Sequence, residues 1–387
     1  MTFWRGAQAS FVTLAALALL GTIEAPRYRR QGDSPARRLL RTLHKDELNR
    51  EARERETAGY YEGLLNEGSR VSAMNSLITG AKKFDWEECN RPGRRHRGDY
   101  RYWDLHPNIT SRSDNPAFDL VTNSHGMADR EYSREKPPYT WRVAVLGDSI
   151  TRGQGAPVGR NYETLLEEAL NSRHPGADRP RVEVLNFAVG GYRITQMVDV
   201  ALEWAPPFQP DMFVVPFSEL TVFKRWGDHI TTLVQNGIDL KYDYLKRVVV
   251  EAGLRADDPA GTADAKLARF RLRTLDWAID QIRSQASRQN ASVVVLLLAN
   301  GNDPEILEEE FAGVREMLAK QGVPVIDLLD AFADLDDPRR YRVGDNNLHP
   351  NEHGHRVLFE KLYARILADP TSFELFCGRK AGPAAAR

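Results

Sequence analysis

The chain has 387 residues, enough for one large domain or two ordinary ones, and its composition of 42% hydrophobic and 28% charged residues is that of a globular protein. Its 53 basic and 54 acidic residues nearly balance, so charge gives no reason to expect a nucleic-acid partner. Two cysteines, Cys89 and Cys377, exclude a disulfide scaffold and a thiolate cluster for zinc, although one long-range disulfide remains open in an oxidising compartment.

The N-terminal segment is uncharged over residues 6–23, with its densest apolar run from Phe11 to Leu20. That run is short for a membrane span, which needs about 20 apolar residues, but it suits the core of a signal peptide or a marginal signal anchor. We therefore expect residues 1–25 to be a signal peptide or signal anchor, so that the protein is exported or is held at a membrane through residues 6–23. The alternatives are a cytoplasmic protein and a first helix buried in the fold.

Residues 26–114 are expected to form a helical and irregular extension. Residues 26–57 are charge-dense, and from about Ser34 onward they predict a solvated helix with interspersed opposite charges. Residues 84–116 are rich in Trp, Arg, Asn, Pro and Asp without clear periodicity, which predicts a loop with short extended pieces. This aromatic and basic mixture either contacts a sugar or an acidic polymer, or simply packs on the main domain.

From Trp141 the pattern changes to short apolar runs that alternate with longer amphipathic segments. The apolar runs cover residues 142–149, 182–191, 211–219, 291–301 and 323–328. Helical segments are expected at residues 161–174, 193–204, 265–288, 305–320 and 351–367. The segment at 265–288 belongs to a longer helical stretch at 222–290. This alternation predicts an α/β domain over residues 115–370, with a mostly parallel five-stranded sheet covered on both faces and a C-terminal tail at 371–387.

The first apolar run leads straight into an Asp-Ser pair, in the segment VAVLGDSITRG. Sites in parallel sheets lie at the carboxyl ends of the strands, which is where Ser149, Gly190 and Gly191 fall. A serine hydroxyl needs a neighbouring base to become a nucleophile, and His349 follows the fifth run, so it can approach Ser149. The plainer alternative is a strand that stops at a turn.

Three segments in this order, VLGDSITRG, VLNFAVGGY and DNNLHPNEHGH, resemble the GDSL or SGNH hydrolases. The segment NSHGMADREY is similar to the piece that precedes the domain in one subset of that family, and the resemblance covers about residues 115–367. It implies a three-layer α/β/α sandwich that carries a serine esterase or acyl-transfer site. Its substrate would be a small acyl ester, such as an acetyl group on a carbohydrate.

The same resemblance assigns roles to individual residues. Ser149 is the implied nucleophile and His349 the implied base. The backbone N–H of Ser149 and that of Gly190 or Gly191 would donate to the oxyanion, since glycine lets the backbone approach the substrate closely.

The sequence departs from the family at two positions. Leu220 stands where an asparagine side chain would donate to the oxyanion, and Asn302 is the candidate substitute, with a helix-capping turn as the alternative. Asn346 stands where the family has its aspartate, three residues before His349. We expect Asp345 to orient His349 through one extra loop residue; otherwise Asn346 or a backbone carbonyl does so.

A histidine cluster, His349, His353 and His355, lacks a carboxylate or cysteine that would complete a metal site, so we expect neither a metal nor a cofactor. The sequence thus predicts an exported serine hydrolase, either a carbohydrate O-acetylesterase or an O-acyltransferase that works through an acyl-enzyme. The alternative, suggested by Leu220 and Asn346, is a non-catalytic binding or scaffold protein of the cell envelope.

Overall fold

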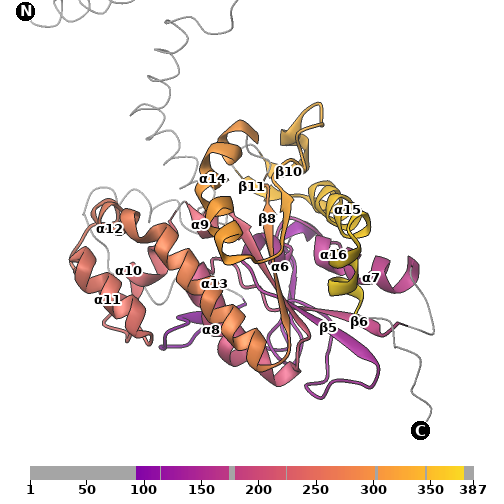
Figure 1. The fold of residues 1–387 in the computed structure, drawn as a ribbon, viewed down its shortest axis with the longest axis horizontal. Helices are drawn as coiled ribbons and strands as arrows, with labels where there is room; N and C mark the ends of the chain where they lie inside the picture. The colour runs from indigo at the N-terminus through magenta and orange to yellow at the C-terminus, as the bar shows by residue number, and fades with distance from the viewer. Residues whose placement is uncertain are drawn as a thin grey trace, which may run out of the picture. The chain divides into compact units, whose positions relative to one another are not determined.

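The structure is a computed structural model that describes residues 93–113, 115–173, 179–223, 225–300, 304–344 and 347–378 (Figure 1). These residues all fall within one compact unit. The expected signal or anchor segment at 6–23 and the expected charged helix at 26–57 lie outside the described residues. Within the ranges given above, no helix is both long enough and apolar enough to cross a membrane.

The central sheet has five parallel strands, which confirms the α/β fold class. The strands are β5 (Thr140–Val145), β6 (Arg181–Asn186), β7 (Met212–Ser218), β8 (Ser292–Leu298) and β9 (Val325–Leu328). Their order across the sheet is β6-β5-β7-β8-β9, so the chain leaves β5 towards one edge and later returns to its other side. The carboxyl end of β5 is therefore a topological switch point, the position at which open α/β sheets bind ligands.

Helices cover both faces of this sheet. The helices of the described residues are α6 (Ser149–Arg152), α7 (Tyr162–Arg173), α8 (Ile194–Asp199), α9 (Glu219–Val222), α10 (Asp228–Gln235), α11 (Asp243–Ala252), α12 (Ala260–Leu267), α13 (Arg271–Arg288), α14 (Pro304–Gln321), α15 (Glu352–Ala368) and α16 (Pro370–Cys377). Helices α7 and α15 pack against each other on one face, while α13 packs against both α8 and α14 on the other (Figure 1). This is the three-layer α/β/α sandwich that the family resemblance implies.

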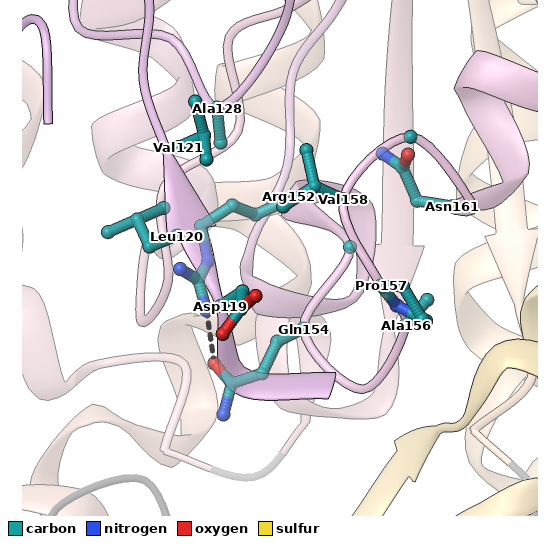
Figure 2. Close-up of a pocket in the computed structure, with 12 residues that line it drawn as sticks. Asp119, Leu120, Val121, Ala128, Arg152, Gln154, Ala156, Pro157, Val158 and Asn161 are labelled. Atoms are coloured by element: carbon teal, nitrogen blue, oxygen red, sulfur yellow. Dashed lines mark hydrogen bonds between the residues drawn. The ribbon is translucent and has the colours of Figure 1, made fainter. Parts of the chain in front are cut away.

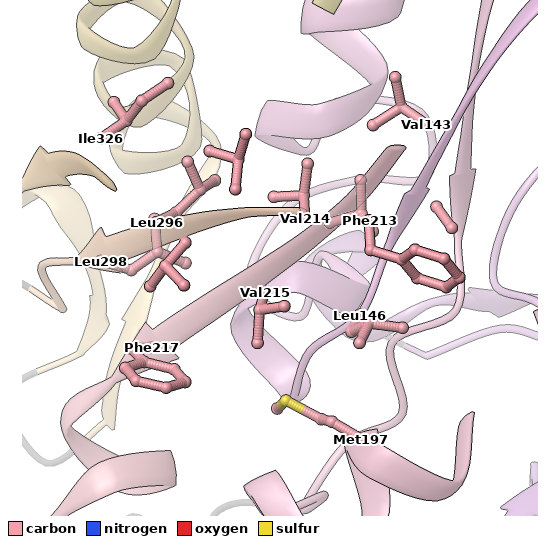
Figure 3. Close-up of a cluster of buried hydrophobic side chains, with 14 of the residues drawn as sticks. Val143, Leu146, Met197, Phe213, Val214, Val215, Phe217, Leu296, Leu298 and Ile326 are labelled. Carbon is pink, nitrogen blue, oxygen red and sulfur yellow. The ribbon is translucent and has the colours of Figure 1, made fainter. Parts of the chain in front are cut away.

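The main core fills the space between the sheet and its helices. Every residue of β7 is buried, because helices cover both of its faces, and this explains why the strand is an unbroken apolar run in the sequence. Figure 3 shows Phe213, Val215 and Phe217 of this strand on the same side of the sheet as Met197 of α8, while Val214 points to the other side with Leu296 of β8.

A second, smaller core lies among helices α10, α11 and α12. It consists of Tyr100, Tyr102, Trp226, Ile230, Leu233, Leu240, Leu245, Val248, Leu254, Ala263, Leu267 and Phe270. The long helical stretch expected at 222–290 therefore divides into the short helices α10, α11 and α12, which have a core of their own, and the longer α13, which packs in the main core. The short helices are separated by turns at Gly237 and Gly253, both of which have positive φ.

Both expected boundaries of the main domain lie inside folded structure. The short hairpin of β1 (Arg94–His96) and β2 (Trp103–Leu105) precedes the boundary expected at residue 115, and β3 (Thr110–Ser111) pairs across it with β4 (Leu120–Val121). At the other end, Phe376 and the free Cys377 of α16 are buried in the main core, beyond the boundary expected at residue 370. Cys89 lies outside the described residues.

Candidate active site

Ser149 begins α6, directly after the carboxyl end of β5. Asp148 holds this turn: its Oδ1 accepts the backbone N–H of Ile150 at 2.9 Å, and its Oδ2 accepts the hydroxyl of Ser218 at 2.7 Å. Because Ser218 ends β7, Asp148 ties the ends of two neighbouring strands together. The position of the Ser149 hydroxyl is thus fixed by the carboxyl ends of β5 and β7.

His349 reaches Ser149 from a hairpin near the C-terminal helix. It lies on β11 (Asn347–Pro350), which pairs with β10 (Arg342–Gly344), and its Nε2 is 2.8 Å from the hydroxyl oxygen of Ser149. The two residues are 200 positions apart in the chain. The structure therefore brings together the nucleophile and the base that the sequence predicts.

The side chain of Asn347 determines which nitrogen of the His349 ring carries the proton. Its Oδ1 is 3.2 Å from the backbone N–H of His349 and 2.7 Å from Nδ1 of the same residue. A backbone N–H can only donate, so the atom that it meets is an acceptor, and Nδ1 must donate to that acceptor as well. Nδ1 therefore holds the proton of the neutral ring, which leaves the lone pair of Nε2 facing Ser149.

The environment keeps this imidazole neutral. His349 is fully buried and Ser149 is 2% exposed. Burial, then the positive charge of Arg152, and then that of His355 lower the pKa of His349 well below its usual value. A neutral imidazole that contacts a serine hydroxyl can act as a general base.

Gly190 and Gly191 follow β6 and lie beside the nucleophile. A Cβ atom placed on Gly190 would be 3.7 Å from Cβ of Ser149. Among the described residues, none accepts a hydrogen bond from the backbone N–H of Ser149 or Gly190. These two N–H groups can therefore donate to a substrate oxygen, as the sequence predicts.

The N-terminal hairpin supplies side chains to the site that sequence reasoning did not single out. The indole N–H of Trp103 and the guanidinium of Arg94 both donate to the carbonyl of Gly190, at 3.1 and 3.3 Å. The guanidinium also lies 5.4 Å above the Trp103 ring. The aromatic and basic segment thus packs on the main domain and forms part of the wall of the site.

Several expected site residues cannot be compared with the structure. Asp345, Asn346 and Asn302 lie outside the described residues, so their assignments stay predictions. Leu220 belongs to α9, which immediately follows β7, the place expected for the oxyanion asparagine of the family.

The other two histidines of the expected cluster, His353 and His355, have different surroundings. His355 is fully buried on α15, stacks on Tyr162 and has its Nε2 3.5 Å from the carbonyl of Gln154, while His353 is exposed. Among the described residues, no group of three or more His, Cys, Asp or Glu side chains could hold a metal ion.

A comparison with family models finds one that matches residues 145–357, more than half of the chain. Its description is "GDSL-like Lipase/Acylhydrolase family". Among curated proteins, the chain is similar to "Single-stranded DNA-binding protein 2" of Homo sapiens, with 30% identity over 145 residues. That similarity covers 36% of this chain and spans only 37% of the length of that relative.

The solved structures to which part of this chain is similar include two esterases and TesA. The Clostridium thermocellum family 3 carbohydrate esterase has a TM-score of 0.39 and 17% identity, and the match covers 61% of this chain and 99% of that one. Axe2, an acetylxylan esterase from Geobacillus stearothermophilus, has a TM-score of 0.39 and 14% identity, over 58% of this chain and 94% of that one. TesA has a TM-score of 0.38 and 12% identity, over 58% and 98%.

Proposed function

The chain belongs to the GDSL-like lipase/acylhydrolase family of ester hydrolases, and from this premise we propose that it cleaves esters with Ser149 as nucleophile and His349 as general base. The observation that carries the proposal is the 2.8 Å contact between the Ser149 hydroxyl and Nε2 of His349. A non-catalytic scaffold would have no need to bring these two groups together from opposite ends of the domain.

The reaction proceeds through an acyl-enzyme. The hydroxyl oxygen of Ser149 attacks the ester carbonyl carbon while its proton passes to Nε2 of His349, and the carbonyl oxygen becomes an oxyanion. The backbone N–H groups of Ser149 and Gly190 donate to that oxyanion. His349 then returns the proton to the departing alcohol oxygen, and the acyl group stays on Ser149.

Release of the acyl group needs a second oxygen nucleophile. His349 takes a proton from water, whose oxygen attacks the acyl carbon. The bond between that carbon and the Ser149 oxygen then breaks, His349 returns the proton to this oxygen, and the carboxylic acid leaves. A sugar hydroxyl in the place of water would give acyl transfer. The proposed substrates are small acyl esters, including acetyl groups on carbohydrate, and the indole of Trp103 beside Gly190 and Gly191 is a surface on which a sugar ring can stack. Product analysis with water alone and with added sugar distinguishes hydrolysis from transfer.

The test uses the purified full chain, 4-nitrophenyl acetate and a fluorophosphonate probe. We expect turnover and labelling of one serine per chain, both abolished by Ser149→Ala, and a loss of turnover of at least about a thousandfold in His349→Ala. Ser172→Ala, which changes an exposed serine on α7, is the control and should behave as the wild type. Labelling or turnover that survives Ser149→Ala would contradict the assignment.

We also propose that the enzyme works outside the cytoplasm, released or held at a membrane by residues 6–23. The support is the uncharged apolar N-terminal segment. A fusion of residues 1–40 to a reporter enzyme that is active only after export should be active, and the same fusion with two arginines inserted near Leu17 should not. A fusion that is inactive in both forms would refute export through this segment.

A further inference from the structure

Two arginine side chains converge on the nucleophile from different parts of the chain. Arg152 ends α6, the short helix that Ser149 begins, while Arg94 lies on β1 of the N-terminal hairpin. A Cβ atom placed on Gly190 would be 3.5 Å from Nε of Arg152, 3.7 Å from Cβ of Ser149 and 3.8 Å from Nη2 of Arg94. Both guanidinium groups therefore lie next to the place where the scissile ester must sit.

Arg152 is half-buried in this position, and among the described residues no carboxylate forms an ion pair with it. Its Nη2 donates to the neutral side-chain oxygen of Gln154 at 2.6 Å, whereas its Nε is buried and makes no hydrogen bond (Figure 2). Asp119 lines the same small cavity, but its carboxylate pairs with Arg112 at 2.7 Å and not with Arg152. Burial and the nearby charge of Arg94 lower the pKa of Arg152 to about 10, so the group is still charged at neutral pH.

An unpaired guanidinium at such a place is costly to the folded protein. A charge removed from water without a partner destabilises the fold, and a second cation nearby adds repulsion. Buried arginines of this kind are typically matched by an anion, which a guanidinium binds through two N–H donors.

We propose that Arg152 and Arg94 form an anion-binding subsite beside Ser149, so that the ester cleaved by this enzyme carries a carboxylate group close to its scissile bond. The proposal rests on the ester hydrolysis proposed above and adds the class of substrate. The carboxylate lies either on the acyl half, as in a succinate half-ester, or on the alcohol half, as in an acetylated uronic acid. Both sources present the same chemistry to the two guanidinium groups.

The test compares anionic and neutral esters in two matched pairs. The acyl pair is 4-nitrophenyl succinate, with its free carboxylate, and 4-nitrophenyl acetate; the alcohol pair is an O-acetylated uronic acid and the corresponding O-acetylated neutral sugar. For at least one pair, we expect kcat/KM of the wild type to favour the anionic ester by roughly 10- to 100-fold, the range of a charged hydrogen bond. The pair that shows the preference identifies the half of the substrate that carries the charge.

Variants then assign the preference to the subsite. Arg152→Gln should reduce the ratio of kcat/KM between anionic and neutral esters by a similar factor, and Arg152→Lys should retain part of it, because the charge remains. The matched control is Arg160→Gln, which removes an accessible arginine that pairs with Glu352 and should leave the ratio unchanged. Added salt should diminish the wild-type preference.

The outcomes separate the subsite from the proposed function. Turnover of neutral esters with ratios near one in both pairs, unaffected by Arg152→Gln, would overturn the anion subsite and leave the esterase assignment intact. Absence of turnover and of labelling at Ser149 would overturn the esterase assignment. In that case, calorimetric titration with succinate tests the anion subsite by itself. Binding to the wild type that Arg152→Gln abolishes would support the subsite, and absence of binding to the wild type would refute it.

Discussion

The side-chain oxygen of Asn347 lies 2.7 Å from Nδ1 of His349 and 3.2 Å from the backbone nitrogen of the same residue. Asn347 is thus placed to orient the imidazole that we propose as the general base, a task that a triad aspartate performs in many serine hydrolases. The difference is that an amide oxygen fixes the tautomer without adding negative charge. This relationship leads to a prediction about rate and about pH dependence.

Asn347→Ala should reduce kcat by roughly 10- to 100-fold with little change in KM, because a hydrogen bond to the imidazolium of the transition state is lost while no substrate contact changes. Asn347→Asp should restore most of the rate. Since a carboxylate favours the charged ring, it should also raise the pKa of His349 and move the acidic limb of the kcat/KM profile to higher pH. The measurement is the pH dependence of 4-nitrophenyl acetate hydrolysis.

Asn236→Ala, at the end of α10 and outside the site, is the control for this pair of variants. It should leave both kcat and the pH profile as they are in the wild type. An unshifted profile in Asn347→Asp, together with full activity in Asn347→Ala, would show that another group orients His349.

Esterase activity should persist at pH values below the usual pKa of histidine. A general base works only while it is neutral, so activity falls as the pH drops through the pKa of His349. Burial, then Arg152 and then His355, lower that pKa well below 6.5, so the acidic limb of kcat/KM should lie below pH 6.5. Arg152→Gln removes a positive charge, which raises the pKa of His349 and should move this limb towards neutral pH.

The profile is measured with a neutral ester, so that the substrate does not titrate, and circular dichroism at each pH confirms that the protein stays folded. Arg160→Gln again serves as the control and should leave the limb in place. A limb above pH 6.5, or one that Arg152→Gln does not move, would contradict the electrostatic environment described for His349.

The sheet could be predicted from local patterns, and the Ser149–His349 pair from the same patterns together with the family resemblance. Strands buried on two faces are continuous apolar runs, and residues that follow parallel strands meet at one edge of the sheet. Ser149 and His349 each follow such a run, so their proximity requires only the fold class. The helices before β9 could also be predicted from their amphipathic spacing, but the breaks between α10, α11 and α12 could not.

The rest of the site depends on long-range contacts that no local pattern encodes. Arg94 and Trp103 approach Gly190 from 96 and 87 positions away, out of a segment without periodicity. Asn347 escaped notice for a different reason. Its contact to His349 is local, but the family spacing directed attention to positions 345 and 346, and the turn that aims the amide at the ring is visible only in three dimensions.

The hairpin that carries His349 is held in place by a close backbone approach at Gly155. This residue has φ of +104°, and a Cβ atom there would lie 2.1 Å from the carbonyl oxygen of Pro350, the neighbour of His349. Gly155→Ala should therefore displace β11, reduce the free energy of unfolding by about 1–3 kcal/mol beyond the backbone strain, and lower kcat. Denaturant unfolding and esterase turnover measure the two effects.

Gly159→Ala is the matched control for the steric part of that prediction. Gly159 also has positive φ, at +78°, but a Cβ atom there meets nothing within 4 Å. In this variant the free energy of unfolding should fall only by the strain of a left-handed alanine, about 1–2 kcal/mol, and kcat should stay at the wild-type value. Equal losses in the two variants would show that the contact with Pro350 is unimportant.

A half-buried carboxyl, that of Asp129 at the end of β6, should make the stability of the protein depend on pH. Burial, and to a lesser degree repulsion from Glu167, raise the pKa of Asp129 to about 7, above its value in the unfolded chain. Its contribution to stability is therefore fully present below about pH 4 and is lost as the pH rises through 7. The charged and titratable groups that surround it are Arg130, Tyr132, Glu163 and Glu167.

Asp129→Asn removes this ionisation, so the Tm of the variant relative to the wild type should rise between about pH 5 and pH 8, whatever the absolute change. Asp369→Asn is the control, because the pKa of Asp369 is shifted in the opposite direction. Hydrogen bonds from the first turn of α16 lower that pKa, so Asp369 is already ionised across this range. Its Tm difference should stay constant from pH 5 to pH 8. A constant difference for Asp129→Asn as well would mean that Asp129 ionises near its ordinary pKa, and that burial at the end of β6 does not keep it protonated.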